Sequence, residues 1–186
     1  MTRTPIRLFV LALTWALSAL VLTAPAQAAA PYCGITWGSL AKSAGHNDPG
    51  GPGDQVTAVR AGRHTCYDRL VIDIGGTTHV KSYSVSYVRN VVSDGSGAVV
   101  PLRGGAFLQI SAGAHNEQYG PANPRELAKV AGFRTFRQVS SAGGFEGYSS
   151  VGLGVRARLP FRVFTLAGTP QSDHTPRLVI DVAHRW

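Results

Sequence analysis

The sequence predicts an all-β protein, a β-sandwich of short, mostly antiparallel strands with one short helix. Short aliphatic and β-branched segments alternate with turns rich in glycine, proline, asparagine and aspartate, which is typical of such folds. The pentapeptide Arg-Leu-Val-Ile-Asp occurs twice, at residues 69–73 and 177–181. Five residues ending in a charge favour a strand over a helix. Only one segment carries both the start and the stop signal of a helix.

The twin pentapeptides predict two half-buried strands. Period-two alternation places Leu70 and Ile72 on one face of the first copy, and Leu178 and Ile180 on one face of the second. We therefore expect these four side chains in the core, and we interpret the twins as framework strands.

Residues 1–28 have the pattern of a signal peptide. Arg3 and Arg7 precede an apolar run at 8–23, and Ala26-Gln27-Ala28 fits the cleavage pattern of small residues. An uncleaved anchor is the alternative, but the run is short for a membrane span. We expect a mature chain of residues 29–186 that forms a single domain and has no stable membrane anchor after cleavage.

Cys33 and Cys66 are the only cysteines. In an exported chain they predict a disulfide, which would stabilise the fold by roughly 3–4 kcal/mol in the chain-entropy model. His64 lies two residues before Cys66, but a zinc site needs more ligands at set spacings.

The expected elements follow from alternation and turn signals. The segment 32–42 reads as a strand held by Cys33, and 43–54 as a loop. The helix is expected where Asn123 serves as N-cap, Pro124 and Glu126 occupy the first turn, and Gly132 terminates. Further strands are expected at 56–63, 66–74, 82–92, 98–102, 106–111, 133–140, 147–159, 161–166 and 177–183.

No catalytic, metal or cofactor motif stands out. The serine strings at 94–97 and 147–152 do not match a nucleophile elbow before a helix. The histidines lack metal-site spacing, although ligands can also converge from distant strands; they are His46, His64, His79, His115, His174 and His184. We expect no catalytic residue, no metal and no cofactor.

Carboxylates keep one enzymatic alternative open. Glycoside hydrolysis needs two carboxyl groups about 5–10 Å apart. Asp73 and Asp181 would approach each other if the twin strands were neighbours, and Glu146 is a third candidate. The same aspartates could equally be the polar ends of an outward face.

An arginine row is the most coherent surface signal. In 153–159 the apolar residues alternate with Arg156 and Arg158, which predicts an outward basic face on a strand. Arg162 would extend the row if Pro160 does not break the register, and Arg134 and Arg137 lie on the preceding strand. We predict ligand binding by Arg156, Arg158, Arg134 and Arg137. The alternative is an ordinary solvated face.

The charge balance points to anionic partners. Without Arg3 and Arg7, 16 of the 18 basic residues remain against 10 acidic ones, a net charge of +6, and 13 of the 16 are arginines. Cell-wall polymers, phospholipid head groups and acidic glycans suit a basic exported protein. Nucleic acid does not fit the export signal. High arginine usage can also reflect a GC-rich genome.

Several motifs, taken in order, resemble the AMIN-like domain family. They are Cys33 with Trp37-Gly38-Ser39-Leu40, then 66–73, 94–97, 133–139, 152–163 and 177–182. The family occurs in exported proteins and lipoproteins of GC-rich Gram-positive bacteria. The resemblance implies a β-sandwich related to AMIN modules, which target cell-wall amidases and secretins to the envelope by contacting peptidoglycan. No amidase domain and no lipoprotein cysteine motif accompany it here.

Three functions are therefore expected in order of preference. The first is a non-catalytic secreted module, extracellular or associated with the cell wall, that binds peptidoglycan or an anionic glycopolymer. The second is a small secreted hydrolase that uses converging carboxylates. The third is a protein-interaction scaffold whose partner is an envelope protein, which a large exposed apolar patch would support.

Overall fold

The computed structural model describes residues 31–45, 48–169 and 174–186. The expected signal peptide lies outside these residues, as does His46. Within the described residues, no helix has the length and apolar character needed to cross a bilayer. The one helical element among them is η1 (Tyr32–Gly34), a short 3₁₀ turn.

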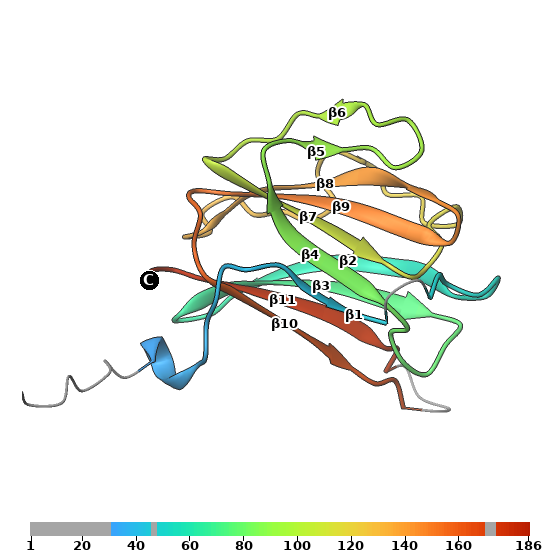
Figure 1. Cartoon of the computed structure of the whole chain (residues 1–186), viewed down its shortest axis with the longest axis horizontal. Helices are drawn as coiled ribbons and strands as arrows, with labels where there is room; N and C mark the ends of the chain where they lie inside the picture. Colours follow the sequence, from blue (N-terminus) through green and yellow to red (C-terminus); the bar gives the residue numbers. More distant parts are fainter. Residues whose placement is uncertain (1–30, 46–47, 170–173) are drawn as a thin grey trace, which may run out of the picture.

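Two antiparallel sheets pack face to face, which confirms the predicted all-β sandwich (Figure 1). One sheet has the order β1-β4-β7-β9-β8, and the other has the order β10-β11-β3-β2. A separate β5-β6 hairpin lies on the outer side of the five-stranded sheet. The strands are β1 (Lys42–Ala44), β2 (Gln55–Arg63), β3 (Tyr67–Gly75), β4 (Tyr83–Val88), β5 (Val91–Val92), β6 (Val99–Val100), β7 (Ala106–Ala112), β8 (Phe136–Phe145), β9 (Tyr148–Val155), β10 (Phe161–Leu166) and β11 (Arg177–Ala183).

The twin pentapeptides lie side by side in the centre of the four-stranded sheet. β11 pairs antiparallel with β3, and Val71 faces Val179 at the midpoint. Each arginine of one copy is therefore opposite the aspartate of the other. The four predicted core residues, Leu70, Ile72, Leu178 and Ile180, are all buried between the sheets, which confirms the framework interpretation.

β9 is buried on both faces, contrary to the expected solvent-facing row. Its inner face packs in the core through Leu153 and Val155. Its outer face is covered by the chain that follows β6: a Cβ on Gly154 would lie 1.9 Å from the carbonyl oxygen of Arg103. Glycine is needed here because the two backbones approach too closely for any side chain.

The expected helix at 123–132 is wrong. An α-helix would bond the Pro124 carbonyl to the amide four residues later. Instead that carbonyl accepts the Ser141 amide of β8 (2.7 Å), and the Leu127 amide donates to Val139 of β8 (2.9 Å). Asn123 still caps locally, since its side chain accepts the Arg125 amide (3.0 Å). The backbone groups of Pro124 and Leu127 therefore pair with β8 at the sheet edge, and not within the segment as in a helix.

Two strand predictions also need correction. The segment 32–42 is η1 followed by irregular chain, held to β10 by a bridge between Gly38 and Phe161. The segment expected at 82–92 is broken into β4 and β5 because the chain leaves the sheet after Val88 to form the β5-β6 hairpin.

Candidate ligand-binding surface

Arg156 and Arg158 do not stand on a strand, because β9 ends at Val155. The Arg156 guanidinium donates to the carbonyl of His184 near the C-terminus. Arg158 lies over the ring of Tyr87, 4.8 Å from its centroid, and donates to the Ser39 carbonyl (3.3 Å). The two side chains therefore serve different parts of the surface, and the predicted outward ladder is not formed.

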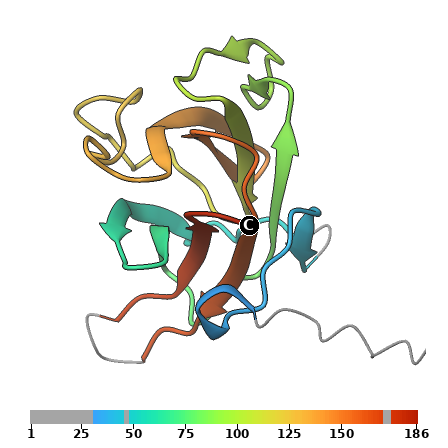
Figure 2. The same ribbon diagram turned by 90° about the vertical axis from the view of Figure 1, so that its left-hand side faces the viewer.

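Arg134 and Arg137 also differ from each other. Both precede or begin β8, but the half-buried Arg137 turns back and donates to the carbonyls of Phe133 (3.2 Å) and Phe136 (2.9 Å). Arg134 is exposed. Arg134 lines a depression of the surface together with His184. His184 lies close to the C-terminus, whose position in the sandwich is marked in Figure 2.

This depression, the basic hollow, is open and has a volume of about 520 Å³. Its lining comes from the end of β2, the start of β3, the chain before β8 and the residue after β11. Segments far apart in the sequence therefore meet there. The lining residues are Arg63, His64, Thr65, Asp68, Gly132, Arg134 and His184. Arg156 is joined to the same rim through the carbonyl of His184.

The buried Asp68 holds the hollow together. One of its carboxylate oxygens accepts the amides of Thr135 (2.6 Å) and Phe136 (3.1 Å), and the other lies 3.2 Å from Nε2 of His184. These contacts tie the start of β8 and the chain end to β3. Because its oxygens are already engaged, Asp68 is a structural anchor of the hollow.

The hollow carries an excess of positive charge, because two arginines, Arg63 and Arg134, and one carboxylate, Asp68, line it. Among residues 31–45, 48–169 and 174–186, no ion pair joins a carboxylate to Arg63, Arg134 or Arg156. The carboxylates that form ion pairs do so with side chains other than these three arginines. A guanidinium presents a planar fork that matches a carboxylate or a phosphate. The arrangement can therefore receive an anionic group without displacing an internal partner.

A second cluster of arginines lies on the outer side of the four-stranded sheet and is already bound to a carboxylate. The carboxylate of Asp181, fully buried, accepts two bonds from Arg69 (2.7 and 2.9 Å) and one from Arg162 (2.8 Å). The hydrogen bonds to Asp181 raise the pKa of Arg69. Arg162 is therefore committed to Asp181 and does not extend a row from Arg158.

Aromatic rings surround these two guanidinium groups. Arg162 lies 5.4 Å from the centroid of Tyr67, 5.7 Å from that of Trp37 and 5.1 Å from that of Phe164. Arg69 lies 5.4 Å from the Phe164 ring. Such stacking contributes about 0.5–1 kcal/mol at exposed sites. We read this cluster as a stabilising arrangement of the sheet face.

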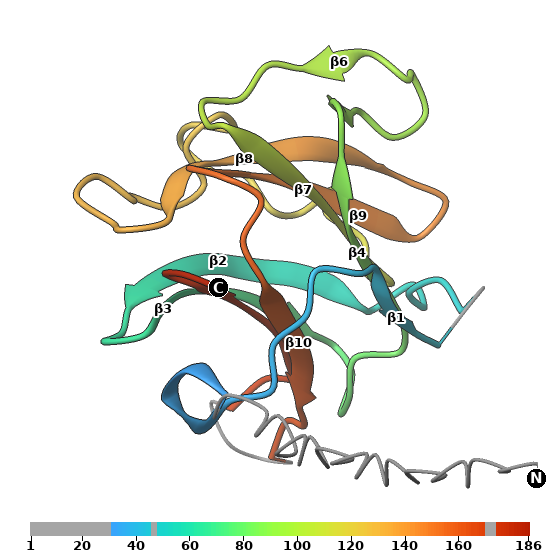
Figure 3. The ribbon, with the colours of Figure 1, turned by 60° about the vertical axis from the view of Figure 1, so that its left-hand side comes forward.

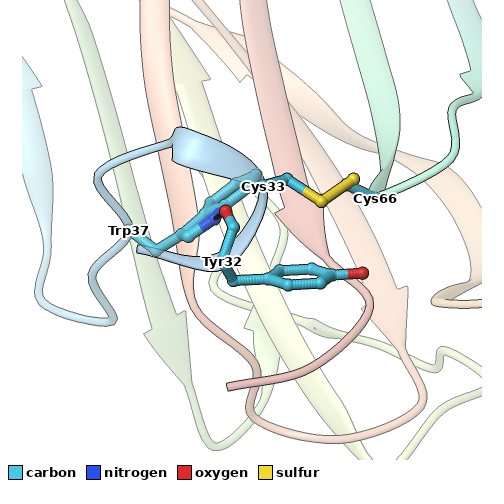
Figure 4. The surroundings of a disulfide bond; sticks show 4 residues. All are labelled: Tyr32, Cys33, Trp37 and Cys66. Atoms are coloured by element: carbon cyan, nitrogen blue, oxygen red, sulfur yellow. Dashed lines mark hydrogen bonds between the residues drawn. A yellow bond between two sulfur atoms is a disulfide. The ribbon is translucent and has the colours of Figure 1, made fainter. Parts of the chain in front are cut away.

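The predicted disulfide between Cys33 and Cys66 is confirmed, with 6.4 Å between the Cα atoms (Figure 4). It fastens η1 beside the outer side of the four-stranded sheet (Figure 3). Trp37 follows η1, donates to the Tyr32 carbonyl (2.8 Å) and packs 5.9 Å from the ring of Tyr67. The bond thus positions one aromatic wall of the arginine cluster.

The carboxylates proposed for hydrolysis are not placed as a pair. Asp181 is opposite Arg69, and Asp73 is four residues farther along β3, which separates the two aspartates by roughly 13 Å at strand spacing. Arg60 also holds Asp73 through two bonds (2.6 and 2.7 Å). Glu146 is exposed in the turn between β8 and β9. Among the described residues, no group of three or more His, Cys, Asp or Glu side chains is placed to hold a metal.

Arg63 and Arg162 acquire their places only through the fold. Arg63 carries no local signal, since it is the last residue of an ordinary strand. For Arg69 the signal was present: antiparallel pairing of two identical segments sets each arginine opposite the other segment's aspartate.

The comparisons agree with the motif resemblance. The family model described as the AMIN-like domain matches residues 54–184, which is most of the chain and includes both twin segments and the basic hollow. A search of curated proteins gave no match.

Proposed function

Because the chain belongs to the AMIN-like domain family, a family of exported cell-envelope domains, we propose that it is a non-catalytic envelope-binding module. Its basic hollow binds the carboxylate or phosphate groups of peptidoglycan or of an anionic wall glycopolymer. One observation carries this proposal: Arg63 and Arg134 line one open depression, and neither forms an ion pair with a carboxylate of the described residues.

The strength of such a contact argues for a polymeric ligand. An exposed guanidinium–carboxylate pair contributes about 0.2–1 kcal/mol, so a single group would bind weakly. A polymer with repeated charges raises the effective concentration of the next group once the first is bound. Arg134 and Arg63 make the direct contacts and Arg156 extends them along the rim. Arg137 and Arg158, whose guanidinium groups bind backbone carbonyls, add to the positive field.

The proposed location is outside the cytoplasm. Residues 1–28 are removed as a signal peptide, and residues 29–186 act as one secreted domain associated with the cell wall. The disulfide fits an oxidising compartment. An envelope protein is the alternative partner, which a large exposed apolar patch would favour. Among the described residues the most exposed large apolar side chains, Leu40, Val99, Phe145 and Trp186, come from four separate segments of the sequence.

Co-sedimentation of the mature protein with purified cell walls tests the proposal. We expect an Arg63→Gln/Arg134→Gln variant to lose most of its wall binding at low salt, and wild-type binding to fall as salt rises. The matched control is Arg89→Gln/Arg125→Gln, which removes the same charge from exposed arginines outside the hollow. Equal losses in both variants would show that net charge alone drives binding, and unchanged binding in the first would reject the hollow.

A further inference from the structure

The outer face of the five-stranded sheet carries a row of four serines. Ser43 pairs with Ser84, Ser84 with Ser111, and Ser111 with Ser150, on β1, β4, β7 and β9 in turn. Directly paired residues point to the same face of a sheet, so the four side chains form one line across it. Their strand neighbours, such as Ile110, point the other way into the core.

Two surface hollows meet along this row. The first, about 270 Å³, is lined by Ser43, Ser84 and Ser111 of the row and by Tyr148. The second, about 290 Å³, shares Ser111 and Tyr148 with the first and continues to Asp94, Phe145 and Glu146. Because two residues line both, the hollows form one continuous depression, which we call the serine groove.

Two buried polar atoms in or beside the groove have no hydrogen-bond partner among the described residues. Ser150, next in the row to Ser111, is 1% exposed, and its Oγ has no hydrogen-bond partner among the described residues. Oδ2 of Asp94, a residue that lines the second hollow, is buried and also lacks such a partner within the described part of the chain. Buried polar groups in native proteins are nearly always hydrogen-bonded. By contrast, Oγ of Ser149, which faces inward, donates to the Ala114 carbonyl (2.6 Å).

The lining does not favour an anionic ligand. No lysine, arginine or histidine of the described residues lines either hollow, and the carboxylates of Asp94 and Glu146 stand at one end. Serine and tyrosine hydroxyls can both donate and accept hydrogen bonds. The aromatic rings of Tyr148 and of Phe145, which is 55% exposed, offer flat apolar surfaces beside them. Hydroxyl donors and acceptors next to exposed rings match the mixed polar and C–H surface of a sugar.

We propose that the serine groove binds a neutral, hydroxyl-rich glycan strand. The groove lies on the five-stranded sheet near the start of β9, whereas the basic hollow is lined by the end of β2, the start of β3, the chain before β8 and the residue after β11. The two sites differ in residues and in charge, so the groove is a second, independent contact and goes beyond the function proposed for the hollow. A glycan that carries acidic groups at intervals would engage both.

Calorimetric titration of the mature protein tests the groove with two neutral probes, a β-1,4-linked N-acetylglucosamine tetramer and a β-1,4-glucan tetramer. We expect at least one to bind, and a tetramer of galacturonic acid to bind more weakly to the Arg63→Gln/Arg134→Gln variant, which lacks the two arginines of the basic hollow. Removing two hydroxyls in Ser84→Ala/Ser111→Ala should lower the affinity by about tenfold or more. Binding of the acetylated probe alone would assign the amide as the recognised group.

Control variants test whether the loss of affinity is specific to the groove. Ser86→Ala lies on the same strand and the same face as Ser84 but outside the groove, and should retain wild-type affinity. Arg63→Gln/Arg134→Gln should also retain it, which separates this proposal from that for the basic hollow. Tyr148→Ala should lose binding while its circular dichroism and melting temperature report whether it folds. Failure of both neutral probes, tighter binding of the acidic one by the Arg63→Gln/Arg134→Gln variant, or equal loss in Ser86→Ala would overturn the proposal.

Discussion

Replacing Asp181 by asparagine should destabilise the fold more than any other single loss of charge in the four-stranded sheet. The carboxylate is fully buried and accepts three charge-assisted hydrogen bonds, at 2.7, 2.9 and 2.8 Å. An asparagine side chain at this position would keep one oxygen acceptor and turn N–H donors toward two guanidinium groups. Arg69 and Arg162 would then face each other across β11 without a neutralising charge.

The size of the expected loss of stability depends on how deeply Asp181 and its two arginine partners are buried. Breaking a fully buried pair costs about 3–5 kcal/mol. The side chains of Arg69 and Arg162 are 24% and 31% exposed, so water recovers part of that cost. We therefore expect Asp181→Asn to lower the free energy of unfolding by about 2–4 kcal/mol. For a domain of this size each kcal/mol shifts the melting temperature by about 2–4 °C.

Urea unfolding and calorimetry of the mature protein measure this effect, and Asp73→Asn is the matched control. Asp73 is the equivalent aspartate of the twin segment, but its partner Arg60 is 57% exposed, so we expect a loss of only about 1 kcal/mol. A loss from Asp181→Asn equal to or smaller than that from Asp73→Asn would refute the reasoning. Such a result would mean that the arginine cluster is solvated and contributes little.

Three further predictions concern the core, the disulfide and the sheet cover. Burial raises the pKa of Tyr87, so its stabilisation is complete below the pKa of the unfolded tyrosine, about 10, and is lost as the pH rises through the folded value. Tyr87→Phe should flatten that alkaline loss of stability in a series of unfolding measurements at rising pH. At neutral pH the variant should lose about 1–2 kcal/mol, because it lacks the hydrogen bonds to the Leu159 backbone (2.7 and 3.0 Å). An unchanged alkaline slope would contradict the assignment of that loss to Tyr87. Cys33→Ser/Cys66→Ser should lose roughly 3–4 kcal/mol in urea unfolding and become insensitive to reductant, whereas a smaller loss would show that η1 contributes little order. Gly154→Ala should lose about 1–3 kcal/mol by overpacking against a backbone carbonyl, and a neutral result would show that the cover over β9 moves freely.

Alternation located the strands well where one face meets the core and the other meets polar surroundings. The strands expected at 161–166 and 177–183 have those bounds in the structure, and the pairs Leu70 with Ile180 and Ile72 with Leu178 are buried as expected. This succeeds because the two-residue period is a local property of the chain. The helix at 123–132 failed for the opposite reason, since β8 supplied hydrogen-bond partners from more than ten residues away.

The candidate site was anticipated only in part. Arg134 lines the basic hollow, but Arg156 and Arg158 follow the end of β9 and separate. The position of an arginine in sequence does not say which carboxylate it meets, because electrostatic partners come from neighbouring strands. Asp181 binds Arg69 from β3 and Arg162 from β10, so these two share a carboxylate while Arg134 remains without such a partner among the described residues.

By itself, then, the sequence determined the all-β class, the disulfide, the family and the inward faces of the twin segments. Only the tertiary structure shows which arginines have no carboxylate partner among the described residues. It also determines that the serines align across four strands and that the chain after β6 covers the outer face of β9. The division has a physical cause. Hydrophobic alternation and turn chemistry act over a few neighbouring residues, whereas ion pairing, register and the burial of a sheet face depend on segments that meet only after folding.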